Sequence, residues 1–302
     1  MTAKIALAVS IFPGTQALPI FAAQATGAFG RRGLAVDIAN AASSDDQRGG
    51  LAEGRYQIAQ GAADQAVAMV EIAKADATIV LGGDGGFNRL FVRPEIATLA
   101  DLRGRTLAVD VASTGWSFAL YKILSRHGLA RTDYALAAVG APSRRFDALQ
   151  RDAAAAAILN PPFSIHARRA GLRDMGTVAT ALGRYQGFVT YVMRAWARAH
   201  ADTLVAYLAA YVEGLRWSLD PANAAQAVAL FADRLALPHD IATEVYTGAV
   251  DPADGLVPDA ALDIAGLTTV LELRAEFNDT IAATPDRYVD LSFCRRALAC
   301  AV

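Results

Sequence analysis

Short apolar segments alternate with helical segments through the first two thirds of this chain, and few folds accommodate that order. Strands are predicted at residues 4–10, 34–40, 56–61 and 77–83, with a helix after each of the first three. The predicted strands are almost entirely apolar, which is typical of strands covered on both faces. Units of this kind favour a parallel sheet with right-handed crossovers.

The alternation begins again at Arg105 and stops near Trp196, after which nearly every segment is predicted to be helical. We therefore expect an α/β fold of two lobes, each a mainly parallel sheet flanked by helices, with a helical C-terminal tail. Extended segments near 89–94 and 185–193 are the expected crossings between the lobes. The predicted division is residues 1–90 plus 192–302 for lobe I and residues 91–191 for lobe II.

The stretch 106–129 combines a predicted strand, a turn of small residues and an amphipathic helix. Ser113 or Thr114 is expected to cap this helix, whose first N–H groups would otherwise lack partners. Such a turn favours an anionic or electron-rich ligand group. A purely structural role as a helix cap is the alternative interpretation.

Composition excludes several classes of function. The formal net charge is −2 and the charges are well mixed, so no nucleic-acid partner is expected. No apolar run is long enough to predict membrane insertion, and no secretory leader is evident, so we expect either a cytoplasmic protein or an omitted leader. Cys294, Cys300 and the scattered histidines have no metal-binding spacing, so neither a metal nor a cofactor is expected.

Loops that follow the predicted strands are expected to meet in one cleft, because ligands of open α/β sheets bind beyond the carboxyl ends of strands. Polar and aromatic residues recur in these loops, and a few convergent polar groups in an apolar cleft are typical of a small-molecule site. The candidate ligand-binding residues are Phe12, Gln16, Asp64, Gln65, Asp84, Phe87, Asn88, Ser113, Thr114, Trp116, Asn160, Phe163, Tyr185 and Gln186.

Several segments resemble the substrate-binding proteins of ABC transporters for nitrate, sulfonates, taurine and thiamine-precursor pyrimidines, the NMT1/THI5-like and SsuA/TauA-like family. The resemblance rests on the opening segment 18–38, on 51–67, on 102–129 and on the ending 288–297. In the opening segment the matching residues are Pro19, Ala23, Gly27, Phe29, Gly33, Leu34 and Asp37.

This resemblance implies a type II periplasmic-binding-protein fold that closes on a small ligand by hinge bending. It further implies no catalysis, no metal, a periplasmic location, a monomer, an ABC permease as partner, and ligand contacts in the loops named above. Asp64 and Asp84 would oppose a small anion, and only Arg89 offers a nearby cation. We therefore expect an organic ligand with an aromatic or amine-bearing part.

Two alternatives remain open from the sequence. A cytoplasmic enzyme on the same fold, such as a decarboxylase, desulfinase or pyrimidine synthase, would agree with the missing leader, and Asp64 and Asp84 could then act as acid and base. The absence of cysteine and histidine from the predicted cleft loops favours the binding protein. A ligand-sensing partner of another protein is the second alternative.

Overall fold

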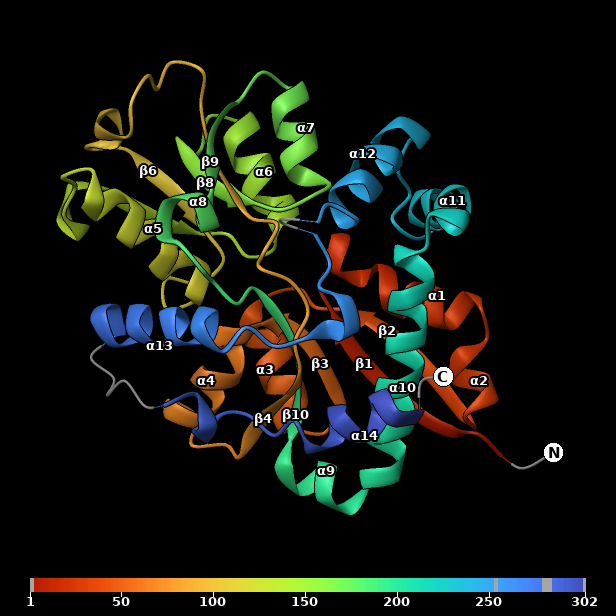
Figure 1. Ribbon diagram of the computed structural model, residues 1–302. Helices are drawn as coiled ribbons and strands as arrows, with labels where there is room; N and C mark the ends of the chain where they lie inside the picture. Colours follow the sequence, from red (N-terminus) through yellow and green to blue (C-terminus); the bar gives the residue numbers. More distant parts are fainter. Residues whose placement is uncertain (1–2, 253–254, 279–283, 301–302) are drawn as a thin grey trace.

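The computed structural model describes residues 3–252, 255–278 and 284–300. Within these ranges ten β-strands form two five-stranded sheets, each surrounded by helices (Figure 1). The strands are β1 Ile5–Ile11, β2 Leu34–Asn40, β3 Ile58–Ala62, β4 Ala77–Leu81, β5 Arg89–Val92, β6 Thr106–Val109, β7 Ala135–Ala138, β8 Ala156–Leu159, β9 Arg173–Thr177 and β10 Phe188–Met193.

Helices connect these strands and make up most of the chain after β10. Short 3₁₀ turns lie at 15–17, 99–102, 131–133, 221–223, 258–260 and 285–287. The α-helices are α1 Leu18–Ala25, α2 Ala28–Arg31, α3 Ser44–Ala52, α4 Ala63–Glu71, α5 Gly115–Arg126, α6 Pro142–Gln150, α7 Phe163–Arg169, α8 Val178–Leu182, α9 Arg194–Ala199, α10 Ala201–Leu219, α11 Ala224–Arg234, α12 His239–Ala249, α13 Ile264–Asn278 and α14 Ser292–Cys300.

Each sheet contains one strand that runs against the other four. The first sheet has the order β2-β1-β3-β10-β4, with β10 antiparallel to both of its neighbours. The second has the order β7-β6-β8-β5-β9, with β5 antiparallel to both of its neighbours. The predicted fold class, two mainly parallel α/β lobes with a helical tail, is therefore confirmed.

We call the layers built on the first and second sheets the first and second lobes. The chain enters the second sheet at β5 and returns to the first sheet at β10, so the connections lie just before these strands. The division at residues 90/91 and 191/192 stays a proposal. The sequence analysis did not predict β9, because its residues RDMGT are mostly polar and the strand lies at the sheet edge.

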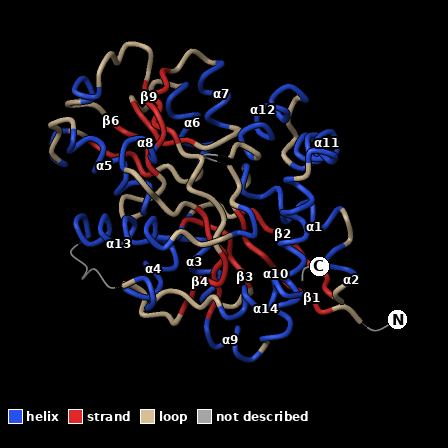
Figure 2. Tube along the Cα trace, viewed as in Figure 1, coloured by secondary structure: helices blue, strands red, loops and turns tan. Residues whose placement is uncertain are grey.

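The helical tail contacts both lobes (Figure 2). Helix α10 packs against α1 and α14 on the first lobe, whereas α12 packs against α7 of the second. Helix α13 packs against α4 of the first lobe and α5 of the second, and Figure 1 shows it along their junction. One apolar cluster includes Ile79, Leu107 and Val270, so the core is continuous from the first lobe through the second to α13.

In the described part of the chain, no helix combines the length and the apolar character that crossing a membrane would require.

Candidate functional site

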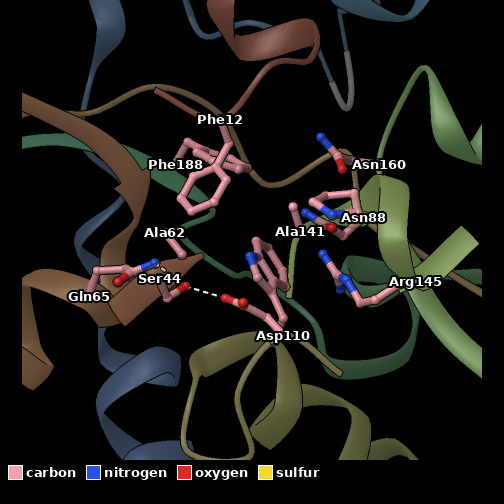
Figure 3. A pocket seen from close by; sticks show the side chains of 12 residues that line it. Phe12, Ser44, Ala62, Gln65, Asn88, Asp110, Ala141, Arg145, Asn160 and Phe188 are labelled. Carbon is pink, nitrogen blue, oxygen red and sulfur yellow. Dashed lines mark hydrogen bonds between the residues drawn. The ribbon is translucent and has the colours of Figure 1, made fainter. Parts of the chain in front are cut away.

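A small cavity of about 30 Å³ lies between the lobes (Figure 3). Several of its lining residues directly follow strands, such as Phe12 after β1 and Asn160 after β8. This is the carboxyl-end location at which open α/β sheets bind ligands. The cavity is lined by Phe12, Ser44, Ala62, Gln65, Asn88, Asp110, Trp116, Ala141, Pro142, Arg145, Asn160 and Phe188.

Arg145 supplies a positive charge to this cavity from the second turn of α6. Its side chain is only 4% exposed, and its Nη1 donates a hydrogen bond to the carbonyl oxygen of Ile158 at 2.6 Å. Burial lowers the pKa of Arg145 to about 10, while the Asp110 carboxylate opposes that shift. Arg145 is therefore charged at neutral pH. The sequence-based expectation that Arg89 is the only cation near the cleft is wrong.

Unpaired polar atoms surround the same cavity. Among the residues that the structure describes, no hydrogen-bond partner is found for Arg145 Nε, Asp110 Oδ1, Asn88 Nδ2 or either amide atom of Asn160. Buried polar atoms usually have partners, so a cluster without them calls for an explanation. A ligand that fills the cavity would supply the missing hydrogen bonds.

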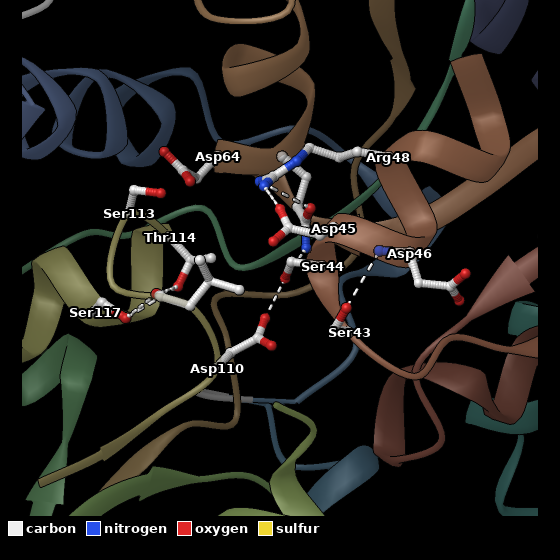
Figure 4. A network of polar contacts seen from close by, with 12 residues as sticks. Ser43, Ser44, Asp45, Asp46, Arg48, Asp64, Asp110, Ser113, Thr114 and Ser117 are labelled. Atoms are coloured by element: carbon white, nitrogen blue, oxygen red, sulfur yellow. Dashed lines mark hydrogen bonds and ion pairs between the residues drawn. The ribbon is translucent and has the colours of Figure 1, made fainter. Parts of the chain in front are cut away.

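Ser44 and Asp110 join the two lobes beside the cavity. Ser44, at the first position of α3, donates through its Oγ to Asp110 Oδ2, and Asp110 follows β6 (Figure 4). Gln65 Nε2 in turn donates to Ser44 Oγ. The lobes are thus held in contact by a buried polar bridge as well as by apolar packing.

The turn before α5 is held together mainly by its own hydrogen bonds. Thr114 occupies the N-cap position, but its side chain makes no capping bond and donates instead to the carbonyl oxygen of Val111 at 3.0 Å. Ser117 Oγ donates to the same oxygen at 2.7 Å. The predicted side-chain cap from Thr114 is therefore wrong, and neither Ser113 nor Thr114 lines the cavity.

Asp64 forms a buried ion pair outside the cavity lining. Arg274 of α13 donates to its two carboxylate oxygens at 2.5 and 2.6 Å, and each side chain is 1% exposed. Arg274 also donates to the carbonyl oxygen of Ser113 at 3.2 Å and lies over the Phe118 ring. The pair therefore fastens α13 to both lobes.

Asp84 also lies outside the cavity lining, near the connections between the lobes. Its Oδ1 accepts hydrogen bonds from the backbone N–H groups of Gly86 at 2.6 Å and Phe188 at 3.4 Å. Burial raises the pKa of Asp84 to about 7, although both backbone bonds favour the charged form. Of the two acidic residues that the sequence analysis singled out, Asp64 is therefore paired with an arginine and Asp84 with backbone N–H groups.

The cavity brings together five of the predicted ligand-binding residues, Phe12, Gln65, Asn88, Trp116 and Asn160. The remaining residues support its surroundings. Tyr185 packs against Trp116 with a centroid separation of 5.0 Å, and Gln186 Nε2 donates to the carbonyl oxygens of Asp84 and Phe188. Outside the cavity lie Gln16, which donates to the carbonyl oxygen of Phe12, and Phe87 and Phe163, which line outer grooves.

Sequence reasoning missed three polar residues of the cavity lining, among them both of its charged residues. Ser44 lies within a helix-start signal, Asp110 directly follows β6, and Arg145 lies inside a helix. The sequence analysis looked for polar residues that directly follow apolar strands. Of the three, only Asp110 fits that pattern, since it is a charged residue just beyond β6. Alternating apolar residues continue from Leu107 to Val111, so the sequence pattern places Asp110 inside a predicted strand.

Two mainly parallel sheets in two lobes, with a cavity between them, define a type II periplasmic-binding-protein fold. The sequence model of the NMT1/THI5-like family matches residues 14–224, and the chain belongs to this family. Among curated proteins, no match is found.

Solved structures share the fold at low sequence identity. A protein from Bordetella bronchiseptica RB50 is 22% identical, with a TM-score of 0.81 and 98% of each chain covered. The periplasmic nitrate-binding protein NrtA from Synechocystis PCC 6803 is 12% identical, with a TM-score of 0.82, covering 99% of this chain and 90% of that one. The alkanesulfonate-binding protein SsuA from Xanthomonas axonopodis pv. citri, bound to MOPS, is 15% identical, with a TM-score of 0.79, covering 96% and 99%.

Proposed function

We propose that this protein binds a small organic solute between its lobes and delivers it to an ABC transporter. The proposed solute is a sulfonate-like, aromatic or pyrimidine-like compound. The observation that carries the proposal is the interlobe cavity with its cluster of unpaired, buried polar atoms. Such atoms around a space between the lobes are suited to holding a ligand by hydrogen bonds from both lobes.

Ligand entry requires the lobes to separate. The cavity of about 30 Å³ is far below the roughly 300–1,000 Å³ of ordinary ligand sites, so the structure represents a closed arrangement. The connections before β5 and β10 are the natural hinges, because the chain passes between the sheets there. A protein that closes around its ligand in this way suits capture and delivery.

The family and the solved relatives support the same reading. NrtA is described as a periplasmic nitrate-binding protein and SsuA as an alkanesulfonate-binding protein. By analogy we propose that the present protein acts in the periplasm as a monomer, with an ABC permease as its partner. The enzyme alternative gains little here, because Asp64 is bound by Arg274 and Asp84 by backbone amides.

The test is a thermal-shift screen of the purified protein against sulfonates, aromatic acids, pyrimidines and amines. A ligand at a hundred times its Kd adds about 2.7 kcal/mol to the free energy of unfolding. We expect Arg145→Gln to abolish the shift, and Arg144→Gln, at the exposed neighbouring position, to leave it unchanged. Recovery of the compound unchanged supports binding; its conversion to a product would establish an enzyme instead.

A further inference from the structure

Two glycines lie where the first lobe touches the second. Gly14 follows β1 in the first lobe, and Gly115 is the first residue of α5 in the second. Phe12, two residues before Gly14, and Trp116, directly after Gly115, line the interlobe cavity. A side chain at either glycine would point into the opposite lobe, as the distances below show.

Gly115 packs directly against Asp64 of α4. A Cβ at Gly115 would lie 2.6 Å from the Cβ of Asp64 and 3.1 Å from its Cγ. Nonbonded carbon atoms ordinarily stay about 3.5–4.0 Å apart, so a methyl group does not fit between the two residues. Figure 4 shows Asp64 beside Ser113, which lies just before this contact in the chain. The lobes therefore approach this closely because residue 115 has no side chain.

Asp64 is held in place and cannot turn aside to make room. Its Cβ is bonded to the backbone of α4, and its two carboxylate oxygens accept hydrogen bonds from Arg274 at 2.5 and 2.6 Å. The side chain is only 1% exposed, so packed neighbours surround it. A methyl group at residue 115 is therefore accommodated when the start of α5 withdraws from α4, which separates the second lobe from the first.

Gly14 makes a second contact of this kind. A Cβ there would lie 2.7 Å from Asn160 Nδ2 and 3.0 Å from the carbonyl oxygen of Pro161, both in the second lobe. The φ of Gly14 is 166°, an extended conformation that any residue adopts, so backbone freedom does not explain a glycine here. Because the Asn160 amide can rotate, this contact should yield more easily than the contact at Gly115.

We propose that Gly115 and Gly14 are positioning residues of the binding site, because the absence of their side chains lets the lobes close. The inference rests on the proposed solute-binding function, since closure around a solute is the event that brings these surfaces together. Gly115→Ala should favour the open arrangement and still fold, because alanine is a better helix former than glycine at the start of α5. The substitution thus separates closure from folding.

Small-angle scattering of the unliganded full-length protein is the first measurement. We expect a larger radius of gyration for Gly115→Ala than for the wild type, and a smaller increase for Gly14→Ala. Gly49→Ala in α3 is the matched control, because a Cβ added there would meet no atom of a neighbouring segment within 4 Å. Its radius should equal that of the wild type. Circular dichroism and melting temperature verify that each variant is folded.

Spin-label distances then measure the closed fraction directly. The labels are placed by Glu53→Cys on the first lobe and Arg151→Cys on the second, two exposed positions, in a Cys300→Ser background because Cys300 is exposed. Insertion of a methyl group into a well-packed contact should lower the ratio of closed to open molecules at least about fivefold in Gly115→Ala. Gly49→Ala should leave the ratio unchanged.

The proposal is overturned if Gly115→Ala keeps the wild-type radius and closed fraction, because the contact then yields within a single lobe. It is equally overturned if Gly49→Ala opens the molecule as much. If Gly115→Ala does not fold, Gly14→Val repeats the test with a larger group in a backbone conformation that valine readily adopts. Both measurements are made without a solute, so failure of the solute-binding function is detected separately, by the thermal-shift screen.

Discussion

Two buried arginine–aspartate sets lie at the junction of the lobes, and they differ in whether the two charged groups meet directly. In the Asp64–Arg274 set the guanidinium meets both carboxylate oxygens directly. In the Asp110–Arg145 set the two side chains face one cavity, and each keeps an unpaired atom. The residue types are the same, so the difference lies in geometry alone.

This difference separates a structural role from a binding role. In the first set the two charges meet directly and neutralise each other without a ligand, although Arg274 Nη1 has no partner among the described residues, and the pair fastens α13 to both lobes. A buried pair held apart by a cavity needs a third molecule to complete it. The two sets should therefore respond differently to substitution: Arg274 variants should lose stability, and Arg145 variants should lose ligand affinity.

The largest expected effect is on the Asp64–Arg274 ion pair. Arg274→Met should lower the free energy of unfolding by about 3–5 kcal/mol, because it leaves the Asp64 carboxylate buried without a partner. Urea denaturation measures this loss. Lys122→Met is the matched control, since Lys122 also joins α5 to α13 through Glu276 but is partly exposed; its cost should be about 0–1 kcal/mol. Equal losses in the two variants would contradict the distinction.

Asp84 adds a third kind of buried carboxylate to this comparison. Its hydrogen bonds in the described part of the chain come from backbone N–H groups, and none of the ion pairs found there includes it. Its pKa in the folded protein is raised from 3.8 to about 7, so the folded state binds the proton more tightly than the unfolded state. The contribution of Asp84 to stability should therefore be present at acid pH, fall as pH rises from 3.8 towards 7, and stay constant above 7. The full change is about 4 kcal/mol at most.

Asp84→Asn is the matched variant for this measurement. Its side-chain oxygen can still accept from the N–H groups of Gly86 and Phe188, but it does not titrate. Subtracting its unfolding free energy from that of the wild type at each pH isolates Asp84 from the other carboxylates. A difference that rises between pH 4 and 7 would overturn the assignment of a raised pKa.

Arg145 should show the reverse of the Arg274 behaviour. Arg145→Gln removes one hydrogen bond to Ile158 and also removes a buried charge, so the unliganded protein should change by no more than about 1.5 kcal/mol. Ligand affinity should nevertheless be lost, as measured by calorimetry with whichever compound the wild type binds. A large loss of stability with affinity retained would make Arg145 a structural residue like Arg274.

The sequence analysis predicted well what depends on local pattern. Apolar and extended runs marked β1 to β6 and β10 in approximate position, because buried strands in α/β sheets carry a continuous apolar signal. Five of the residues expected in the cleft, among them Asn160 after β8, line one interlobe cavity, and their role in ligand binding stays a prediction. The strand β9 escaped because an edge strand with polar residues carries no such signal.

Contacts between distant segments could not be predicted in this way. Asp64 and Arg274 are 210 residues apart, and nothing in the helical tail marks Arg274 as the partner. Arg145 lies within a helix, so a search restricted to loops overlooks it. The pairing of charges is decided by tertiary packing, which is why the sequence analysis assigned the wrong surroundings to Asp64.

The smallest expected effect concerns the hydrogen bond between Ser44 and Asp110. It involves the aspartate of the Asp110–Arg145 set, and it also joins the two lobes. Ser44→Ala removes the bond to Asp110, which exists only when the lobes are closed, together with the bond from Gln65 within the first lobe. Loss of the bond to Asp110 should disfavour closure by about 1 kcal/mol. Small-angle scattering of the unliganded protein should then report a larger radius of gyration.

Ser43→Ala is the control, because Ser43 caps α3 through the N–H of Asp46 within one lobe. It should cost about 1 kcal/mol of stability without changing the radius. An unchanged radius in Ser44→Ala would mean that apolar packing alone holds the lobes together, and that the unpaired charges play no part in closure before the ligand arrives.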